Sequence, residues 1–498
     1  MKLVDSAYVS PKTGKRWIPV IGLEVHCQLK TRTKLFCGCE YTFGASPNSL
    51  TCPVCTGQPG ALPVLNEEAL ALAVRTAQAL GAEVASESRF DRKNYFYCDL
   101  PKGYQISQFD RPYCKGGGIA LANGRFVRLA RIHMEEDAGK AIHDRGDATL
   151  VDLNRAGVPL IESVTEADIQ SAADAQEYLA ALKEILQYTG ASDCDMEKGS
   201  LRCDVNISVH PPGEPWRTKV EIKNLNSFRY VGAAIEHEIA RQVAAYESED
   251  PSRYPVQETR LYDPQRGETR SMRGKESAHD YRYMPDPDLP LVHVDAAFLE
   301  RQRAHLPELP AARRERYEKQ YGLTPTDAGV LTSERAVADF FEAVVRAGGR
   351  AKEASNWIQN ELLRWVGDQE LGLERFDELQ LRPSELAEVV DLVERGTIQN
   401  QAGRKLLREM AKSGRPAKVL VQELGLEQVQ DAGRIEEWCR AALVGKEKVI
   451  ADVRAGKEAA LNALLGPVLK LSGGKANVQL VRETLKRLIA ETEPPLNP

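Results

Sequence analysis

In roughly the first 290 residues, short stretches alternate apolar and polar side chains, which is the pattern of strands buried on one face. The polar positions are Glu24, His26 and Gln28 in residues 23–29; Arg202, Asp204, Asn206 and Ser208 in residues 201–209; Lys219, Glu221 and Lys223 in residues 219–223; Glu135, Glu136 and Asp137 at the end of residues 131–137; and Asp152 and Asn154 in residues 151–154. We therefore expect mixed α and β structure built around a sheet with one polar face.

The residue types on this polar face predict a divalent-metal site. The solvent-facing positions of ordinary strands carry a mixture of Thr, Lys, Ser and Glu with no common chemistry, whereas the polar positions of the predicted strands carry Glu, His, Asp, Asn and Lys. Oxygen and nitrogen ligands suit Mg²⁺, nearby cations suit phosphates, and several carboxylates on one face repel each other unless a metal neutralises them. We interpret the face as a candidate site for Mg²⁺ and ATP chemistry. The alternative is a set of separate wet strand faces that never meet, and spacing alone favours neither.

Two aromatic and basic segments are candidates for contact with a nucleotide. Residues 91–110 combine Tyr95, Phe96, Tyr97, Tyr104 and Phe109 with Arg92, Lys93 and Lys102, and residues 280–287 read DYRYMPDP. Aromatic rings beside cations stack on bases, but structural loops with half-buried tyrosines have the same composition, which slightly favours the structural interpretation. Since the sequence contains neither a GxxxxGK[ST] loop nor a GxGxxG fingerprint, metal ions and side chains would have to hold ATP.

Four of the ten cysteines form a compact pattern, Cys37-Gly-Cys39 followed by Cys52-Pro-Val-Cys55. Two close pairs across a short loop can wrap one tetrahedral Zn²⁺, and four cysteine ligands leave no open position, so we predict a structural zinc site. Four buried thiols are the main alternative, and a redox pair is a weaker one. We expect Cys27, Cys98 and Cys203 in the core because they lie in apolar patterns.

The character of the chain changes after the Pro-rich residues 284–291, MPDPDLPL. From about residue 299 onward, Ala, Leu, Glu, Lys and Arg recur with helical spacing and little strand signal. Before that point, helical patterns cover residues 67–80, 171–188 and 231–246. We predict an α+β fold with three domains, at residues 1–294, 295–400 and 401–498, of which the second is all-α and the third is an α-helical tail.

The predicted tail carries basic residues at helical spacing, although the whole chain has a net charge of −6. They are Arg404, Arg408, Lys412 and Arg415, followed by Lys470, Lys475, Arg482, Lys486 and Arg487. Such a stripe can contact the phosphates of RNA, although a solvated helix face is the commoner explanation. The sequence shows no bilayer-spanning apolar stretch and no signal peptide, so we expect a cytoplasmic protein with no membrane partner.

Long motifs, in order along almost the whole chain, make the sequence resemble a known family. They are IGLEVHCQL (21–29), PNSLTCPVCTGQPGALPVLN (47–66), FDRKNYFYCDLPKGYQISQFD (90–110), RIHMEEDAGK (131–140), VDLNRAGVPLIE (151–162), GSLRCDVNISV (199–209), EIKNLNSFRYV (221–231) and DYRYMPDPDLP (280–290). The family is the B-type subunit of the tRNA-dependent amidotransferase, the enzyme that converts misacylated Glu-tRNA(Gln) or Asp-tRNA(Asn) into Gln-tRNA(Gln) or Asn-tRNA(Asn). The resemblance implies a catalytic cradle domain whose antiparallel sheet is similar to the glutamine synthetase fold, followed by helical and tail domains.

The resemblance also implies a reaction and its residues. With ATP and Mg²⁺ the side-chain carboxylate of the aminoacyl-tRNA is phosphorylated, and ammonia then displaces phosphate. Carried over by motif, the implied magnesium ligands are Glu24, His26, Glu136 and Glu221, with Glu135 and Asp204 helping to hold the ions and Arg202, Asn206 and Lys223 binding ATP. No Gly/Ser-rich Ser-Ser-Lys amidase signature occurs here, so the resemblance implies that ammonia comes from an amidase-type glutaminase partner, braced by a small third subunit.

Two functions of other classes fit parts of the same sequence. A non-catalytic, zinc-containing RNA-binding scaffold would bind tRNA without ATP turnover, but it does not need clustered carboxylates. A free-standing ATP-dependent ligase for a small acid would act without RNA, but it leaves the helical tail without a clear purpose.

Overall fold

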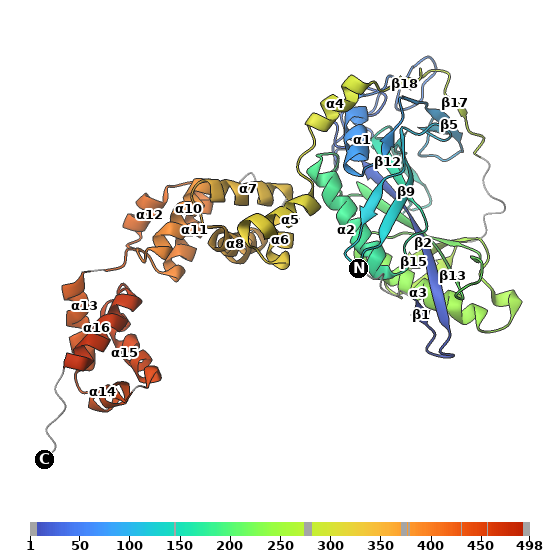
Figure 1. Ribbon diagram of the computed structural model, residues 1–498. Coiled ribbons are helices and arrows are strands. Elements are labelled where there is room, and N and C mark those ends of the chain that lie inside the picture. Colours follow the sequence, from blue (N-terminus) through green and yellow to red (C-terminus); the bar gives the residue numbers. More distant parts are fainter. Residues whose placement is uncertain are drawn as a thin grey trace. The chain divides into compact units, whose positions relative to one another are not determined.

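The computed structural model describes residues 7–143, 146–272, 281–369, 376, 379–429, 431–455 and 457–491. The chain divides into two compact units, Met1–Pro310 and Ala311–Pro498 (Figure 1). The first unit is built around a large sheet and the second is helical, so the predicted α+β fold class is confirmed. Among the described residues, no helix combines the length and the apolar character that a bilayer span requires.

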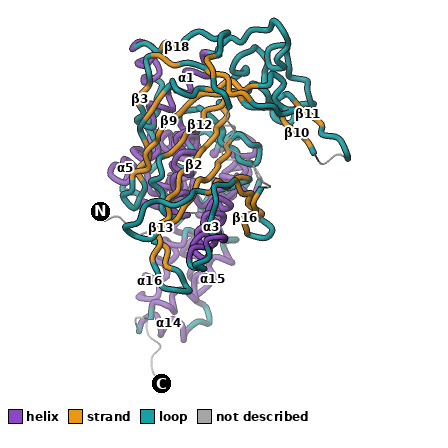
Figure 2. The backbone as a smooth tube through the Cα atoms, turned by 90° about the vertical axis from the view of Figure 1, so that its right-hand side faces the viewer, coloured by secondary structure: helices purple, strands orange, loops and turns teal. Residues whose placement is uncertain are grey.

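In the described part of the chain, eleven strands form one sheet in the order β16-β15-β14-β13-β2-β12-β9-β7-β3, with β1 on β2 and β8 on β9. Its paired strands are antiparallel except for β14 and β15, and Figure 2 shows β9, β12, β2 and β13 side by side. The strands are β1 (Tyr8–Val9), β2 (Arg16–Gln28), β3 (Glu83–Val84), β7 (Cys114–Lys115), β8 (Gly118–Ala120), β9 (Phe126–Glu136), β12 (Pro159–Thr165), β13 (Leu201–His210), β14 (Val220–Lys223), β15 (Thr259–Asp263) and β16 (Glu268–Ser271).

Helices α2 and α3 help to cover the apolar face of this sheet. Leu23 and Val205 on the strands belong to one core with Leu179 on α2 and Ile235 on α3, and all four are 0–1% exposed. Because side chains alternate along a strand, this burial leaves the other face to the polar residues. Helix α3 begins before its predicted start because the Ser227 side chain caps its first turn. The helices of this unit are α1 (Glu67–Ala79), α2 (Ala172–Tyr188), α3 (Phe228–Tyr246), the 3-10 helix η1 (Pro251–Arg253) and α4 (Ala296–Ala304).

The two aromatic segments come together in a three-stranded sheet, β17-β5-β6. Phe109 stacks on Tyr283 with ring centroids 4.1 Å apart, and Tyr95 packs edge-on against Tyr281 at 5.7 Å. Asp280, the first residue of the second segment, lies outside the described residues. The strands of this sheet and of a further pair are β5 (Asp91–Asn94), β6 (Tyr104–Ser107), β17 (Met284–Pro285), β4 (Glu87–Ser88) and β18 (Val292–His293).

Two predictions about the first unit are wrong. Residues 151–154 do not join the polar face, because β11 (Leu150–Asp152) pairs with β10 (Lys140–Ile142) in a separate hairpin. Asp152 and Asn154 instead accept hydrogen bonds from backbone amides of the loop that carries the cysteines. Cys98 is exposed because it lies in a turn after β5, whereas Cys27 and Cys203 are buried as predicted.

The helical unit contains two buried hydrophobic clusters. Phe341 and Leu406 belong to the first and Val481 to the second, and all three are fully buried. Buried residues change from one cluster to the other between Val421 and Ile435, while the domain boundary at residue 400 stays a prediction. The helices are α5 (Pro310–Tyr321), α6 (Pro325–Thr332), α7 (Arg335–Arg346), α8 (Ala351–Trp357), the π-helix η2 (Ile358–Leu362), α9 (Leu363–Asp368), α10 (Pro383–Glu394), α11 (Asn400–Ser413), α12 (Ala417–Glu423), α13 (Ala432–Leu443), α14 (Glu447–Arg454), α15 (Glu458–Leu471) and α16 (Val478–Glu491).

Candidate active site

The strand register gathers polar residues from distant parts of the sequence on the open face of the large sheet. Glu162 on β12 lies opposite both His26 on β2 and His133 on β9. Asp204 on β13 lies opposite Glu24 on β2. Side chains of directly opposed residues project to the same face of a sheet, so these residues share one surface.

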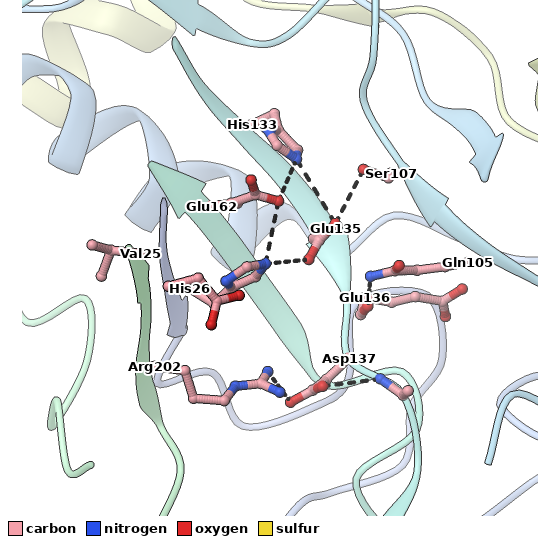
Figure 3. A network of polar contacts seen from close by, with 12 residues as sticks. Val25, His26, Gln105, Ser107, His133, Glu135, Glu136, Asp137, Glu162 and Arg202 are labelled. Carbon is pink, nitrogen blue, oxygen red and sulfur yellow. Dashed lines mark hydrogen bonds and ion pairs between the residues drawn. The ribbon is translucent and has the colours of Figure 1, made fainter. Parts of the chain in front are cut away.

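One group of potential metal ligands consists of His26, Glu135 and Glu162, and Figure 3 shows their side chains pointing toward one another. One ligand atom of each residue lies within 4.8 Å of the others. The Nε2 atom of His26 is 3.2 Å from Oε2 of Glu162 and 3.6 Å from Oε1 of Glu135. A second histidine, His133, places its Nε2 atom 3.1 Å from the same Glu162 oxygen. An imidazole and two carboxylates in this arrangement fit a divalent cation.

Ion pairing balances the charge of this group. Burial lowers the pKa of His133, but the charges and hydrogen bonds of Glu162 and Glu135 outweigh burial and raise that pKa to about 9. Burial also lowers the pKa of His26, but the hydrogen bond and charge of Glu162 and the charge of Glu135 outweigh this effect, so the pKa of His26 is raised. Burial raises the pKa of Glu162, yet the two histidines outweigh it, and the pKa lies well below its ordinary value. A bound divalent cation would replace the imidazole protons as the counter-charge of these carboxylates.

A second group consists of Glu24, Asp204 and Glu221, whose carboxylate oxygens lie within 4.8 Å of one another. Burial, followed by the charges of neighbouring carboxylates, raises the pKa of Glu24. Lys223 offsets part of the repulsion, because its Nζ atom pairs with Asp204 and lies 2.9 Å from Glu221. Three converging carboxylates are oxygen ligands of the kind that Mg²⁺ prefers, so the residues present fit that ion.

The Glu221 carboxylate is oriented by Thr259 on the parallel strand β15, whose Oγ1 donates a 2.6 Å hydrogen bond to Oε2. We predict that Thr259→Val, which keeps the shape and removes the donor, weakens Mg²⁺ binding about tenfold in calorimetric titrations. Thr259→Ser keeps the hydroxyl and should bind Mg²⁺ as the unaltered chain does. Equal affinities of the Val and Ser variants would contradict the positioning role.

Two cavities open over these groups, with volumes of about 410 and 340 Å³. Both are lined by His26, Lys93, Asp204 and Lys223. The larger cavity also contains Arg202, whose Nη2 atom is 2.9 Å from Oδ2 of Asp137. The smaller contains the stacked rings of Phe109 and Tyr283. Volumes of about 300–1,000 Å³ are typical of small-molecule sites, and the cations beside the carboxylates suit phosphate oxygens.

The residues predicted to bind magnesium and ATP lie on this face with one exception. Asn206 donates a 2.9 Å hydrogen bond from Nδ2 to Oε1 of Glu24. Glu136 directly follows Glu135, so its side chain projects to the other face, where it accepts a 2.9 Å hydrogen bond from the Ile106 amide and pairs with Lys102. The predicted position of Glu136 among the magnesium ligands is therefore wrong, because adjacent residues of a regular strand face opposite sides.

Sequence reasoning missed Glu162 and His133. Glu162 is the single acid in the seven residues of β12, PLIESVT, and an isolated acid in a buried apolar strand is a usable signal. His133 stands two positions before Glu135, so the alternation of β9 already places both on one face.

The four predicted zinc ligands converge in the loop between β2 and α1. The Sγ atoms of Cys37, Cys39, Cys52 and Cys55 lie within 4.8 Å of one another. The Cys52 amide donates a 3.1 Å hydrogen bond to Sγ of Cys55. Four converging thiols are the donor set of a closed tetrahedral zinc site, so these residues fit Zn²⁺.

A largely antiparallel sheet, backed by helices and carrying two groups of potential metal ligands under two cavities, defines the first unit as an α+β domain with a candidate active site. A family model described as the GatB/GatE catalytic domain matches residues 19–300, and one described as the GatB domain matches residues 339–489. The chain belongs to the GatB family, and the resemblance seen in its motifs is confirmed.

Relatives named as the B-type subunit of aspartyl/glutamyl-tRNA(Asn/Gln) amidotransferase are similar over nearly the whole chain. The protein of Caldicellulosiruptor saccharolyticus is 48% identical over 472 residues, which are 94% of this chain and 98% of that protein. The protein of Carboxydothermus hydrogenoformans is 48% identical over 480 residues, which are 95% and 98% of the two chains. The protein of Anaeromyxobacter dehalogenans is 49% identical over 482 residues, with the same coverage of 95% and 98%.

Proposed function

We propose that this chain is a subunit of a cytoplasmic, ATP-dependent amidotransferase that converts Glu-tRNA(Gln) or Asp-tRNA(Asn) into Gln-tRNA(Gln) or Asn-tRNA(Asn). The observation that carries the proposal is the presence of two carboxylate-rich ligand groups on one face beneath open cavities. The substrates follow from the names of the relatives, which are similar to nearly the whole chain.

The chemistry explains why such a face is needed. A carboxylate is a poor acyl donor because oxide cannot leave, so the γ-phosphoryl group of ATP is first transferred to a side-chain carboxylate oxygen, giving an acyl phosphate and ADP. Ammonia then attacks the carbonyl carbon, the C–N bond forms, and the C–O bond to phosphate breaks. The nitrogen loses a proton, and the products are the amide and inorganic phosphate.

In our proposal, the position of each residue on the polar face of the sheet decides whether it binds a metal ion, contacts the substrate or orients another side chain. Bound Mg²⁺ would supply neutralisation of the phosphate charge. Glu24, Asp204 and Glu221 would hold one ion and His26, Glu135 and Glu162 another. Lys223 and Arg202 line the larger cavity, where they would contact phosphate or carboxylate oxygens, and Asn206 would orient Glu24.

The proposed reaction needs a source of ammonia and a surface that binds tRNA. In our proposal an amidase-type glutaminase subunit releases ammonia from glutamine, and a small third subunit braces the complex. The helical unit would contact the tRNA, and helix α11 exposes Arg408 and Lys412 for phosphate contacts.

Transamidation by the assembled complex tests the proposal. With the glutaminase and the small third subunit, ATP, Mg²⁺ and glutamine, the chain should form labelled Gln-tRNA(Gln) from Glu-tRNA(Gln), or Asn-tRNA(Asn) from Asp-tRNA(Asn). Binding of tRNA without ATP turnover would instead support the RNA-binding scaffold. Amidation of a free acid without tRNA would support the free-standing ligase.

We also propose that the four-cysteine site holds a structural Zn²⁺, at about one ion per chain. Cys39→Ser is expected to release the ion and to lower the melting temperature by about 5 °C or more, since zinc binding stabilises only the folded loop. Cys98→Ser, at an exposed cysteine outside the cluster, is the matched control and should change neither quantity. Metal analysis and thermal denaturation check both, and a Cys39→Ser chain with full zinc content would contradict the ligand assignment.

A further inference from the structure

Lys34 is a charged side chain outside the polar face that has 0% of its surface exposed. Its Nζ atom lies 2.9 Å from the Leu50 carbonyl oxygen, 3.4 Å from the Leu153 carbonyl oxygen and 3.6 Å from Sγ of Cys55. An ammonium group has three N–H donors, and these three acceptors satisfy all of them. Lys34 is therefore an interior side chain whose hydrogen-bond donors are all satisfied.

The surroundings of Lys34 identify its counter-charge. A buried ammonium is costly unless an opposite charge is close, and the two carbonyl groups supply only partial charges. The third acceptor, Cys55, is a member of the four-cysteine cluster. Four thiolates around one divalent cation leave a net negative charge that is also costly to bury. The positive charge of the Lys34 ammonium and the net negative charge of the metal-bound cysteines would therefore each lower the free-energy cost of burying the other.

Packing around this contact is close. A Cβ atom built at Gly157, whose φ is +85°, would lie 3.4 Å from Cβ of Cys55 and 3.5 Å from Cδ of Lys34. The Gly157 carbonyl also accepts the Leu35 amide at 2.8 Å. The segment that leads into β12 therefore lies directly against the Lys34 and Cys55 side chains, and this close packing strengthens the electrostatic contact between them.

We propose that Lys34 is the buried counter-charge of the thiolate metal centre formed by Cys37, Cys39, Cys52 and Cys55. It donates to the Cys55 sulfur from one side while the Cys52 amide donates to the same sulfur. It also ties the cysteine loop at Leu50 to the segment at Leu153. The inference rests on the proposed zinc site and adds a residue outside the ligand set that sets its affinity for the ion.

Zinc release from the full-length chain tests this role. Zinc-loaded protein is mixed with excess chelator and the released ion is followed with a colorimetric zinc indicator. Lys34→Met, which keeps the length and removes the charge, should release zinc about tenfold faster or more. Lys34→Arg should release it more slowly than Lys34→Met, and Lys30→Met, at an exposed lysine nearby, should match the unaltered chain. Equal release rates for Lys34→Met and Lys30→Met would overturn the proposal.

A second comparison separates charge pairing from ordinary packing. In a chain with all four cysteines replaced by Ser, Lys34 loses its counter-charge, so Lys34→Met should raise the melting temperature there while lowering it in the cysteine-containing chain. The same loss in both backgrounds, or failure to fold in both, would overturn the proposal. Failure to fold only with the cysteines present would support it. An unaltered chain that holds no zinc would reject the metal itself, whereas a zinc-loaded chain with unchanged release rejects only the role of Lys34.

Discussion

Glu24→Gln is expected to reduce amide formation on misacylated tRNA by about 10²-fold or more in the assembled complex, while glutamine hydrolysis by the partner glutaminase continues. Glu24 lies within 4.8 Å of two other carboxylates, and burial together with their charges raises its pKa. The amide has almost the same shape as the carboxylate but carries no charge, so the proposed ion would lose a ligand while the strand keeps its packing. The measurement is the rate of labelled Gln-tRNA or Asn-tRNA formation.

The matched control for Glu24→Gln is Glu236→Gln, at an exposed position on α3. It introduces the same chemical change in the same unit, away from the ligand groups, and should leave transamidation unchanged. Glutamine hydrolysis, measured in parallel, shows whether the complex still assembles. Full transamidation by the Glu24→Gln variant would reject the assignment of this carboxylate group to the reaction.

Glu162→Gln should produce a loss of similar size, although Glu162 belongs to the other ligand group. Its Oε2 atom is 3.2 Å from His26 and 3.1 Å from His133, and its side chain is only 10% exposed. Removing the charge would delete one ligand of the proposed metal site and would leave Glu135 as the remaining carboxylate beside the buried His133 and the partly exposed His26. Breaking a buried ion pair from one side typically costs about 3–5 kcal/mol, so the melting temperature should fall as well as the activity.

Glu166→Gln is the control for this second variant, because Glu166 follows the same strand and is exposed. Transamidation, magnesium affinity and thermal denaturation should all be unchanged in it. If Glu162→Gln lowered only the melting temperature and kept full activity once folded, Glu162 would be a structural partner of the histidines and not part of the metal site.

Local patterns were enough to predict most of the elements that carry the site. Residues 23–29 and 201–209 alternate strictly, and both form strands with the expected polar face. The pattern at residues 151–154 is equally regular but belongs to a separate hairpin, since alternation does not say which strand a segment pairs with. Spacing likewise predicted the cysteine cluster, because a short loop between two close pairs of cysteines keeps the pairs near each other in space.

The sequence by itself determined the classes of residue on each face, the helical second half and the family, because each of these depends on short-range periodicity or on motif identity. Only the tertiary structure decided which polar residues meet. Strand register, which is set by pairing between segments that are not adjacent in the sequence, placed Glu162 between His26 and His133. The same pairing, together with the alternation of β9, put Glu136 on the opposite face from Glu135. The burial of Lys34 against Cys55 also depends on the Leu153 segment that folds over it, and no local pattern contains that contact.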